Sequence, residues 1–424
     1  MVTREFRYNS GMSVYLHDIP LPEAKTRLQA ALENAGLWGV LGTETVPLDE
    51  NALGRVLAAP LWAKISSPHY HAAAMDGFAV RATETAGAQP SSPLTLSLGL
   101  QAKYVDTGDP LPEGFDAVIP IENVESLDAS GRVTQDIRAP RSIRIRAAVT
   151  PWSSVRPMGE DIVATQLVHP AGQVLRPVDL GAAAAAGYQE IKVARQPRVA
   201  ILPTGSELVP IGHALRAGDI LEYNSLVLAA QVNHWGGLAT RFDIIPDNFE
   251  IICARVRKAA RDHDLVLLNA GSSAGAQDFS ARVVEKLGRL LVHGVAVRPG
   301  HPVIIGMLKN GKREVPILGV PGYPVSAALT GEIFVEPLMA KWTGRTPLEL
   351  PVQIAQLTRK VTSPGGDDDF IRVAVGKVGE RVLAAPLARG AGVITSLVKA
   401  DGLVRVPLDS NGLPEGQMVE VELF

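Results

Sequence analysis

The sequence has little cysteine, few aromatic residues and no long run of one charge or of apolar residues. Cys253 is the single cysteine among 424 residues, which excludes an internal disulfide framework and a cysteine-rich zinc site. It follows two isoleucines in a helix-like stretch, so we expect a buried structural thiol. The net charge is −3 and no run of five Lys or Arg occurs, which gives no reason to expect nucleic acid as a partner. No apolar stretch has membrane-spanning length and residues 1–10 are polar, so we expect no membrane association and a cytoplasmic protein.

The composition that is present is globular, with 46% hydrophobic and 20% charged residues. A chain of this length predicts about two to four domains. Residues 20–66 show helical periodicity over Ala24–Gly36 and Val46–Ala59, with a helix start signal at Asp49. Short strand-like runs separated by Pro and Gly follow, and helical character returns at Pro177–Ala186. We therefore predict a helical or linker domain of residues 1–66 and 151–195 with a β-rich insertion at 67–150, an α/β domain at 196–346 and a C-terminal β domain at 350–424.

The α/β region alternates strand, turn and helix, which predicts a doubly wound sheet with parallel strands. We expect Asn224 to cap a helix over Ser225–Trp235, and Phe249–His263 to form the next helix. The strand-rich C-terminal region has glycine turns typical of a compact barrel or sandwich. The predicted fold is multidomain α/β.

Four glycine-bearing turns follow short apolar runs in this region. They lie at residues 203–207, 269–278, 297–302 and 318–324. Ligands bind at the carboxyl edge of open α/β sheets, and glycine lets backbone N–H groups approach a phosphate or another oxyanion. The four turns together predict a site for a phosphorylated ligand.

Three carboxylates follow strand-like runs in the same region, namely Glu207, Asp247 and Asp278. Convergence of these side chains on one sheet edge would give an oxygen-rich site suited to Mg²⁺. The alternative for Asp247 is a cap of the helix that starts at Phe249. Arg298 and His301 would supply positive charge to an oxyanion, and Arg298 is the stronger candidate because it stays charged.

Asp76 precedes a glycine, and by its pattern alone it is a turn aspartate. Thr107 opens a Gly-Asp-Pro turn, and Asp161 ends a Gly-Glu-Asp segment typical of a solvated loop. Taken singly, none of these segments predicts a site.

The chain resembles the molybdopterin molybdotransferases, which include the E domain of gephyrin. The similarity runs from about residue 20 to 424. Its most specific segments are Ala74–Ala79, Thr107-Gly108, Leu111-Pro112, Arg156 with Gly159–Asp161, Thr204–Leu208, Asn224-Ser225, Pro321-Gly322 with Pro324, Phe370–Arg372 and Gly392–Leu397.

The resemblance implies an enzyme that inserts molybdate into adenylylated molybdopterin with release of AMP, using Mg²⁺ held by Glu207, Asp247 and Asp278. It also implies a homodimer in which Asp76 acts on the site of the other subunit. Further partners would be the preceding adenylyltransferase or a recipient molybdoenzyme. The implied substrate-binding residues are Thr107, Asp161, Thr204, Gly205, Asn224, Gly271, Ser273, Gly275, Arg298, His301, Pro321, Pro324, Arg372 and Ser396.

Several turns depart from the family pattern. Ala270 stands where the family has Gly, Arg298 and His301 where it has Lys, and Tyr323 where it has Asn. These changes keep two alternatives to the active transferase open. One is a paralogue with altered specificity or no insertion activity that binds a pterin or nucleotide, and the other is a partner scaffold.

Overall fold

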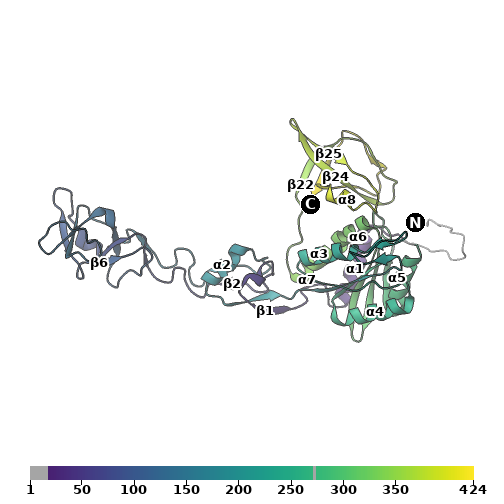
Figure 1. Ribbon diagram of the computed structural model, residues 1–424, viewed down its shortest axis with the longest axis horizontal. Coiled ribbons are helices and arrows are strands. Elements are labelled where there is room, and N and C mark those ends of the chain that lie inside the picture. The colour runs from purple at the N-terminus through teal and green to yellow at the C-terminus, as the bar shows by residue number, and fades with distance from the viewer. Residues whose placement is uncertain (1–17, 271–273) are drawn as a thin grey trace. The chain divides into compact units, whose positions relative to one another are not determined.

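The computed structural model describes residues 18–270 and 274–424, and for residues 274–278 it describes the backbone alone. The chain forms two compact units. One contains the described residues up to Glu44 together with Ala194–Phe424, and the other is Thr45–Val193. The elements of each unit are shown in Figure 1. The predicted domain boundaries within these units remain predictions.

A six-stranded sheet organises the first unit. Its strand order is β16 (Leu238–Arg241), β13 (Arg198–Pro203), β17 (Leu265–Asn269), β21 (Arg313–Val320), β20 (Ile304–Asn310) and β18 (Gly288–His293). The first four are parallel, whereas β20 is antiparallel to both of its neighbours. The all-parallel expectation therefore fails at this side, because β20 and β21 form a hairpin around Gly311.

Both faces of the sheet are covered, as the doubly wound prediction requires. Leu265 and Leu267 of β17 pack into one core, and Val266 and Leu268 pack into the other. This alternation follows from the two-residue period of a strand. The first face is covered by α1 (Leu21–Asn34), α3 (Asn224–His234), α6 (Pro324–Thr330), the π-helix Gly331–Val335 and α7 (Glu336–Thr343). The second is covered by α4 (Phe249–Asp262) and α5 (Ala274–Leu287) (Figure 1).

Cys253 lies in α4 and is 2% exposed, which confirms the expected buried thiol. Burial raises its pKa. No helix in the described part of the chain is long and apolar enough to cross a membrane.

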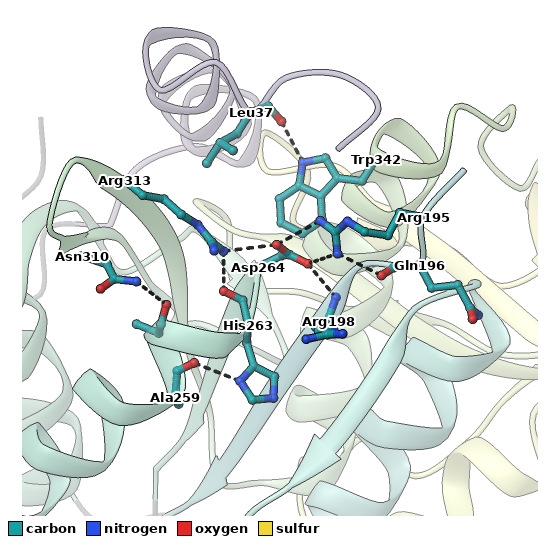
Figure 2. A network of polar contacts seen from close by, with 11 residues as sticks. Leu37, Arg195, Gln196, Arg198, Ala259, His263, Asp264, Asn310, Arg313 and Trp342 are labelled. Carbon is teal, nitrogen blue, oxygen red and sulfur yellow. Dashed lines mark hydrogen bonds and ion pairs between the residues drawn. The ribbon is translucent and has the colours of Figure 1, made fainter. Parts of the chain in front are cut away.

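A hydrogen-bond network holds the amino edge of the sheet, opposite the predicted site (Figure 2). Asp264, directly before β17, accepts from Arg195 at 2.9 and 3.2 Å, from the backbone N–H of Arg198 at 2.8 Å and from Arg313 at 3.1 Å. The Trp342 indole donates to the Leu37 carbonyl at 2.7 Å. These contacts fix the start of neighbouring strands and leave the carboxyl edge for function.

The C-terminal region is a closed five-stranded barrel. Pairing of β24 with β26 closes the sheet formed by β24 (Asp368–Val378), β25 (Arg381–Pro386), β22 (Val352–Leu357), β28 (Met418–Leu423) and β26 (Gly402–Val406). The short strand β19 (Val297–Arg298) pairs in parallel with β24. The predicted turn at 297–302 therefore begins with a strand that pairs with the barrel, contrary to the expected place after a strand of the α/β sheet. The turn still lies at the carboxyl edge of the α/β sheet, because it precedes β20, which runs antiparallel to β21 and therefore begins at that edge.

The second unit is rich in short strands. One three-stranded sheet has the strand order β6 (Ala102–Val105), β4 (Gly77–Val80) and β7 (Ala117–Pro120). Another has the order β5 (Leu94–Ser97), β9 (Ser142–Ile145) and β8 (Val124–Leu127). Two-stranded pairs join β3 (Ala72–Ala73) to β10 (Val155–Arg156) and β2 (Leu61–Trp62) to β11 (Leu167–His169), and α2 spans Pro177–Ala185.

The helix expected over Val46–Ala59 is wrong. Residues Thr43–Pro47 form strand β1, which pairs with β12 (Glu190–Ala194), and only Glu50–Ala52 makes a 3₁₀ turn. The start signal at Asp49 is nonetheless used, since its side chain accepts from the Asn51 N–H at 2.9 Å. Strand pairing outweighs the helical periodicity here.

Candidate active site

Polar groups join the carboxyl ends of three neighbouring strands. Thr204, after β13, donates from its backbone N–H to the Asn269 carbonyl at 2.8 Å. The Asn269 side chain, at the end of β17, donates to the Val320 and Pro321 carbonyls at 3.3 and 3.1 Å. Asn269 is 3% exposed, so its amide is a buried connector. The predicted positions Thr204 and Pro321 are thereby brought to one edge.

Asn224 does not cap α3, contrary to expectation. It is the first helical residue, and its side-chain amide donates to the Gly322 carbonyl at 2.7 Å. The buried Glu222 carboxylate instead accepts from the Ser225 backbone N–H at 2.8 Å and from its hydroxyl at 2.5 Å. Glu222 takes the capping role, which leaves Asn224 to hold the turn that precedes Pro324.

Glu207 and Asp247 are brought together by their neighbours. The Ser206 N–H donates to Asp247 Oδ2 at 3.2 Å, and the Asp247 N–H donates to Ser206 Oγ at 3.1 Å. The helix cap is Asn248, whose side chain accepts from Glu250 and Ile251. The capping alternative for Asp247 is therefore wrong.

The absence of a side chain at Gly205 leaves room for the Glu207 carboxylate. A Cβ at Gly205 would lie 3.1 Å from both carboxylate oxygens, and its φ of +153° suits glycine alone. Among the described residues the Glu207 carboxylate has no hydrogen-bond or ion-pair partner. The carboxyl edge thus holds Glu207, unpaired among the described residues, one position along the chain from the Ser206 that bonds Asp247.

The third predicted carboxylate, Asp278, lies in α5, as does Gly275. For both residues the structure describes the backbone alone. Gly271 and Ser273 also lie outside the described residues. Among the side chains that are described, no group of three or more His, Cys, Asp or Glu residues is placed to hold a metal ion. The three-carboxylate site remains a prediction.

The basic turn already contacts carboxylates. Arg298 Nη2 lies 2.6 Å from Asp367 Oδ2, and His301 Nε2 lies 2.9 Å from Asp18 Oδ2. His301 Nδ1 is 4.0 Å from the other oxygen of Asp367. Asp367 is 8% exposed, so the carboxylate is held between the two predicted anion-binding residues. Arg298 and His301 are thus brought together as predicted, with an internal anion between them.

The barrel contributes two buried polar residues. Arg372 is 3% exposed and donates from Nη2 to the Ala388 carbonyl at 2.8 Å, while its Nε has no partner in the described structure. Burial lowers the pKa of its guanidinium. Ser396 is 4% exposed and donates to the Val393 carbonyl at 2.7 Å. The Ala391 carbonyl of the same loop accepts from the Val325 N–H at 3.0 Å, which joins the loop to the start of α6.

Asp76 has a defined partner in the second unit. Asp76 Oδ1 accepts from both the hydroxyl and the backbone N–H of Thr107 at 2.7 Å. The Thr107 hydroxyl, followed by its N–H, lowers the pKa of Asp76. Both residues are exposed, so this pair presents a fixed carboxylate to solvent. Asp161 is also exposed, and its N–H donates to the Ser67 carbonyl at 3.0 Å.

Three family models match consecutive parts of the chain. They are the MoeA N-terminal region (domain I and II) at residues 19–187, the probable molybdopterin binding domain at 200–341 and the MoeA C-terminal region (domain IV) at 355–424. Molybdopterin molybdenumtransferase 2 of Mycobacterium tuberculosis is 32% identical over 402 residues, covering 89% of this chain and 94% of that relative. The chain belongs to the MoeA family.

Other MoeA proteins agree over nearly the whole length. Molybdopterin molybdenumtransferase of Haemophilus influenzae is 29% identical over 400 residues, which are 90% of this chain and 94% of the relative. The crystal structure of the molybdopterin biosynthesis MoeA protein from Pyrococcus horikosii matches with a TM-score of 0.78 and 32% identity, covering 96% of this chain and 99% of that one. These matches confirm the resemblance and the multidomain α/β fold.

Two residues of this MoeA site were missed by the sequence reasoning. Asp367 pairs with Arg298, and Asn269 connects three strand ends. The sequence signal for Asp367 is that it opens a run of three consecutive aspartates. In the structure each of the three is buried and paired with a different arginine. Buried carboxylates require such partners. The identity of each partner depends on the fold.

Proposed function

We propose that this MoeA-family chain is a molybdenumtransferase that inserts molybdenum from molybdate into adenylylated molybdopterin and releases AMP. The names of its relatives support the transfer to molybdopterin. The observation that carries the proposal is the unpaired Glu207 carboxylate beside Asp247, at a glycine-bearing sheet edge. Such an edge suits a phosphorylated ligand.

The donors present at this edge fit a Mg²⁺ ion. Glu207 keeps both carboxylate oxygens without a partner among the described residues, and Asp247 uses one oxygen for Ser206. Hard carboxylate oxygens are the ligands that Mg²⁺ prefers. We assign Glu207 and Asp247 as ligands, with Asp278 from the sequence as the third. The ion would neutralise negative charge on the phosphates of the substrate.

The remaining residues would bind the two substrates. The turn at Pro321-Gly322 would offer backbone N–H groups to the phosphates, and Gly205 would let them approach the sheet edge closely. Arg298 and His301, with Arg372 and Ser396 of the barrel, would receive molybdate. In the reaction, water attacks the phosphoanhydride, one P–O bond breaks and AMP leaves. The two dithiolene sulfurs then bind molybdenum in place of one oxide of molybdate, which leaves as water with the two thiol protons.

We also propose that the enzyme is a cytoplasmic homodimer in which Asp76 of one subunit serves the site of the other. Its fixed, exposed carboxylate is suited to a site completed by a second surface. The preceding adenylyltransferase and a recipient molybdoenzyme are the proposed protein partners. These assemblies follow from the family resemblance.

Release of AMP tests the proposal directly. Purified protein with adenylylated molybdopterin and Mg²⁺ should release AMP when molybdate is added, and chelation of Mg²⁺ should stop it. Glu207→Gln, which keeps the side-chain volume and removes the charge, should reduce the rate at least about tenfold. Glu380→Gln, the same change in the exposed β24–β25 turn, is the matched control. Equal rates in all three proteins would reject the assigned ligand and the site.

A further inference from the structure

Trp152 has an unusual combination of exposure and backbone conformation. Its side chain is 53% exposed, and its φ of +67° is left-handed. Ser154, two residues later, is also left-handed with φ +52°. Left-handed conformations are unfavourable for bulky side chains and concentrate at functional sites. The turn thus holds a large apolar ring in solvent at the expense of backbone strain.

The ring of His71 lies against this tryptophan. The two ring centroids are 4.8 Å apart with an interplanar angle of 50°. His71 Nδ1 accepts from the Met158 N–H at 3.0 Å, which fixes the orientation of the imidazole. Aromatic pairs at this separation are mutually attractive. Trp152 and His71 therefore form one positioned aromatic surface, which we call the ring platform.

The ring platform belongs to the same framework as Asp76. The Ala74 N–H donates to the Ser154 carbonyl at 2.9 Å, and β3 pairs with β10 directly beyond the turn. The Gly108 N–H donates to the Ala73 carbonyl at 2.9 Å, next to the Thr107 that holds Asp76. Short backbone bonds thus tie the platform to the Asp76–Thr107 pair.

The surroundings favour a small flat ligand. Met75, which directly precedes Asp76, and Met158, whose N–H bonds His71, are 43% and 52% exposed, and thioether side chains adapt to the outline of a ring. Aromatic side chains bind nucleobase-like rings by stacking, while a few placed polar groups fix the orientation. Asp76 and Thr107 provide such polar groups. A fused nitrogen heterocycle meets both requirements.

We propose that Trp152 and His71 stack on a fused heteroaromatic ring of the substrate, and that Trp152 sets specificity for it. The inference rests on the proposed function, because adenylylated molybdopterin carries two such rings, a pterin and an adenine. Both present a flat π-face and nitrogen-bearing edges. Which of the two occupies the platform is decided by experiment.

Calorimetric titration with AMP and, separately, with pterin-6-carboxylate tests the platform in the full-length protein. Trp152→Gly removes the ring at a position whose backbone suits glycine, so the variant should fold at least as well as the wild type. Its affinity for one of the two probes should fall roughly tenfold or more, the loss expected for one stacking partner. Trp152→Phe should retain most of the affinity. Trp62→Ala, which removes an equally exposed tryptophan at 53%, should have no effect.

The probe that Trp152→Gly binds more weakly identifies the ring that occupies the ring platform. Equal affinities of wild type and Trp152→Gly for both probes, or no binding of either probe to the wild type, would overturn the inference. The proposed function is measured separately by AMP release from the complete substrate. An active enzyme with an unaffected Trp152→Gly variant would reject the platform alone, whereas an inactive wild type that still binds a probe through Trp152 would reject the reaction alone.

Discussion

Arg298 and Asp367 form a 2.6 Å ion pair that joins the basic turn of the α/β region to the start of barrel strand β24. The Arg298 side chain is 42% exposed, whereas the Asp367 side chain is 11% exposed. The cation proposed to receive molybdate thus already has an internal anion. An incoming oxyanion must share Arg298 with Asp367 or displace it.

Removing this internal charge should strengthen molybdate binding. Asp367→Asn keeps the shape of the side chain and removes the repulsion between a carboxylate and the molybdate dianion. We expect the dissociation constant to fall about threefold to tenfold, because partial exposure screens the repulsion. Calorimetric titration measures it, with Glu380→Gln as a control for net charge. An unchanged constant in a folded Asp367→Asn protein would place molybdate elsewhere.

The pH dependence of activity should reveal the Asp76–Thr107 hydrogen bonds. Because Thr107 lowers the pKa of Asp76, the carboxylate stays charged at more acidic pH than an ordinary aspartate. Thr107→Val removes the hydroxyl, so activity should be lost at a higher pH as the pH falls. Thr107→Ser should restore the wild-type profile of kcat/KM. Superimposable acid limbs in all three proteins would mean that Asp76 does not act as a carboxylate in turnover.

Stability should depend on pH through Glu332 in the π-helix. Burial, and then the charge of Glu422, raise its pKa from 4.5 to about 7. The folded protein therefore holds this proton more tightly than the unfolded chain. Protonated Glu332 contributes fully to stability below about pH 4.5, and this contribution is lost as the pH rises through about 7.

Glu332→Gln should remove this dependence. We expect the variant to be about 1–3 kcal/mol more stable than the wild type at pH 8 and nearly equal to it at pH 4.5. Urea denaturation at both pH values measures the difference, with the exposed Glu349→Gln as control. A variant that is less stable at pH 8 would contradict the assigned cause.

Much of the fold was predictable because local signals agree with it. The strong periodicity of α4 predicts this helix over Phe249–His263, within one residue of its observed bounds. The Val46–Ala59 prediction failed because pairing of β1 with β12 depends on residues far along the chain. The reversal of β20 has a local signal in Gly311-Lys312, a two-residue hairpin loop that starts with glycine, because Asn310 pairs with Arg313 across it.

The candidate site was predictable in its residue types and less so in its contacts. Gly205 and Glu207 could be assigned because a glycine turn follows a strand. The partner of Arg298 lies 69 residues away, and the Asn224 amide bonds to Gly322 at a distance of 98 residues. Such pairs are created by the packing of the barrel loop and helices, which no local pattern encodes.

A mixed dimer tests the proposed action of Asp76 across subunits. Asp76→Ala and Glu207→Ala should each be inactive, but their mixture should recover up to about a quarter of the wild-type activity, because a random mixed dimer contains one complete site. The measurement is AMP release after verified subunit exchange. Exchange without any recovery would show that both residues serve a site within one subunit.

Reconstitution of a molybdoenzyme tests the central claim most directly. Purified protein, adenylylated molybdopterin, molybdate and Mg²⁺ are incubated with a molybdoenzyme that lacks its cofactor, and the enzyme's activity and molybdenum content are measured. The wild type should restore activity with AMP released in equal amount to the molybdenum incorporated, and Glu207→Gln should restore at most about a tenth as fast. Binding of the substrates by a folded wild-type protein without AMP release or molybdenum incorporation would contradict the account.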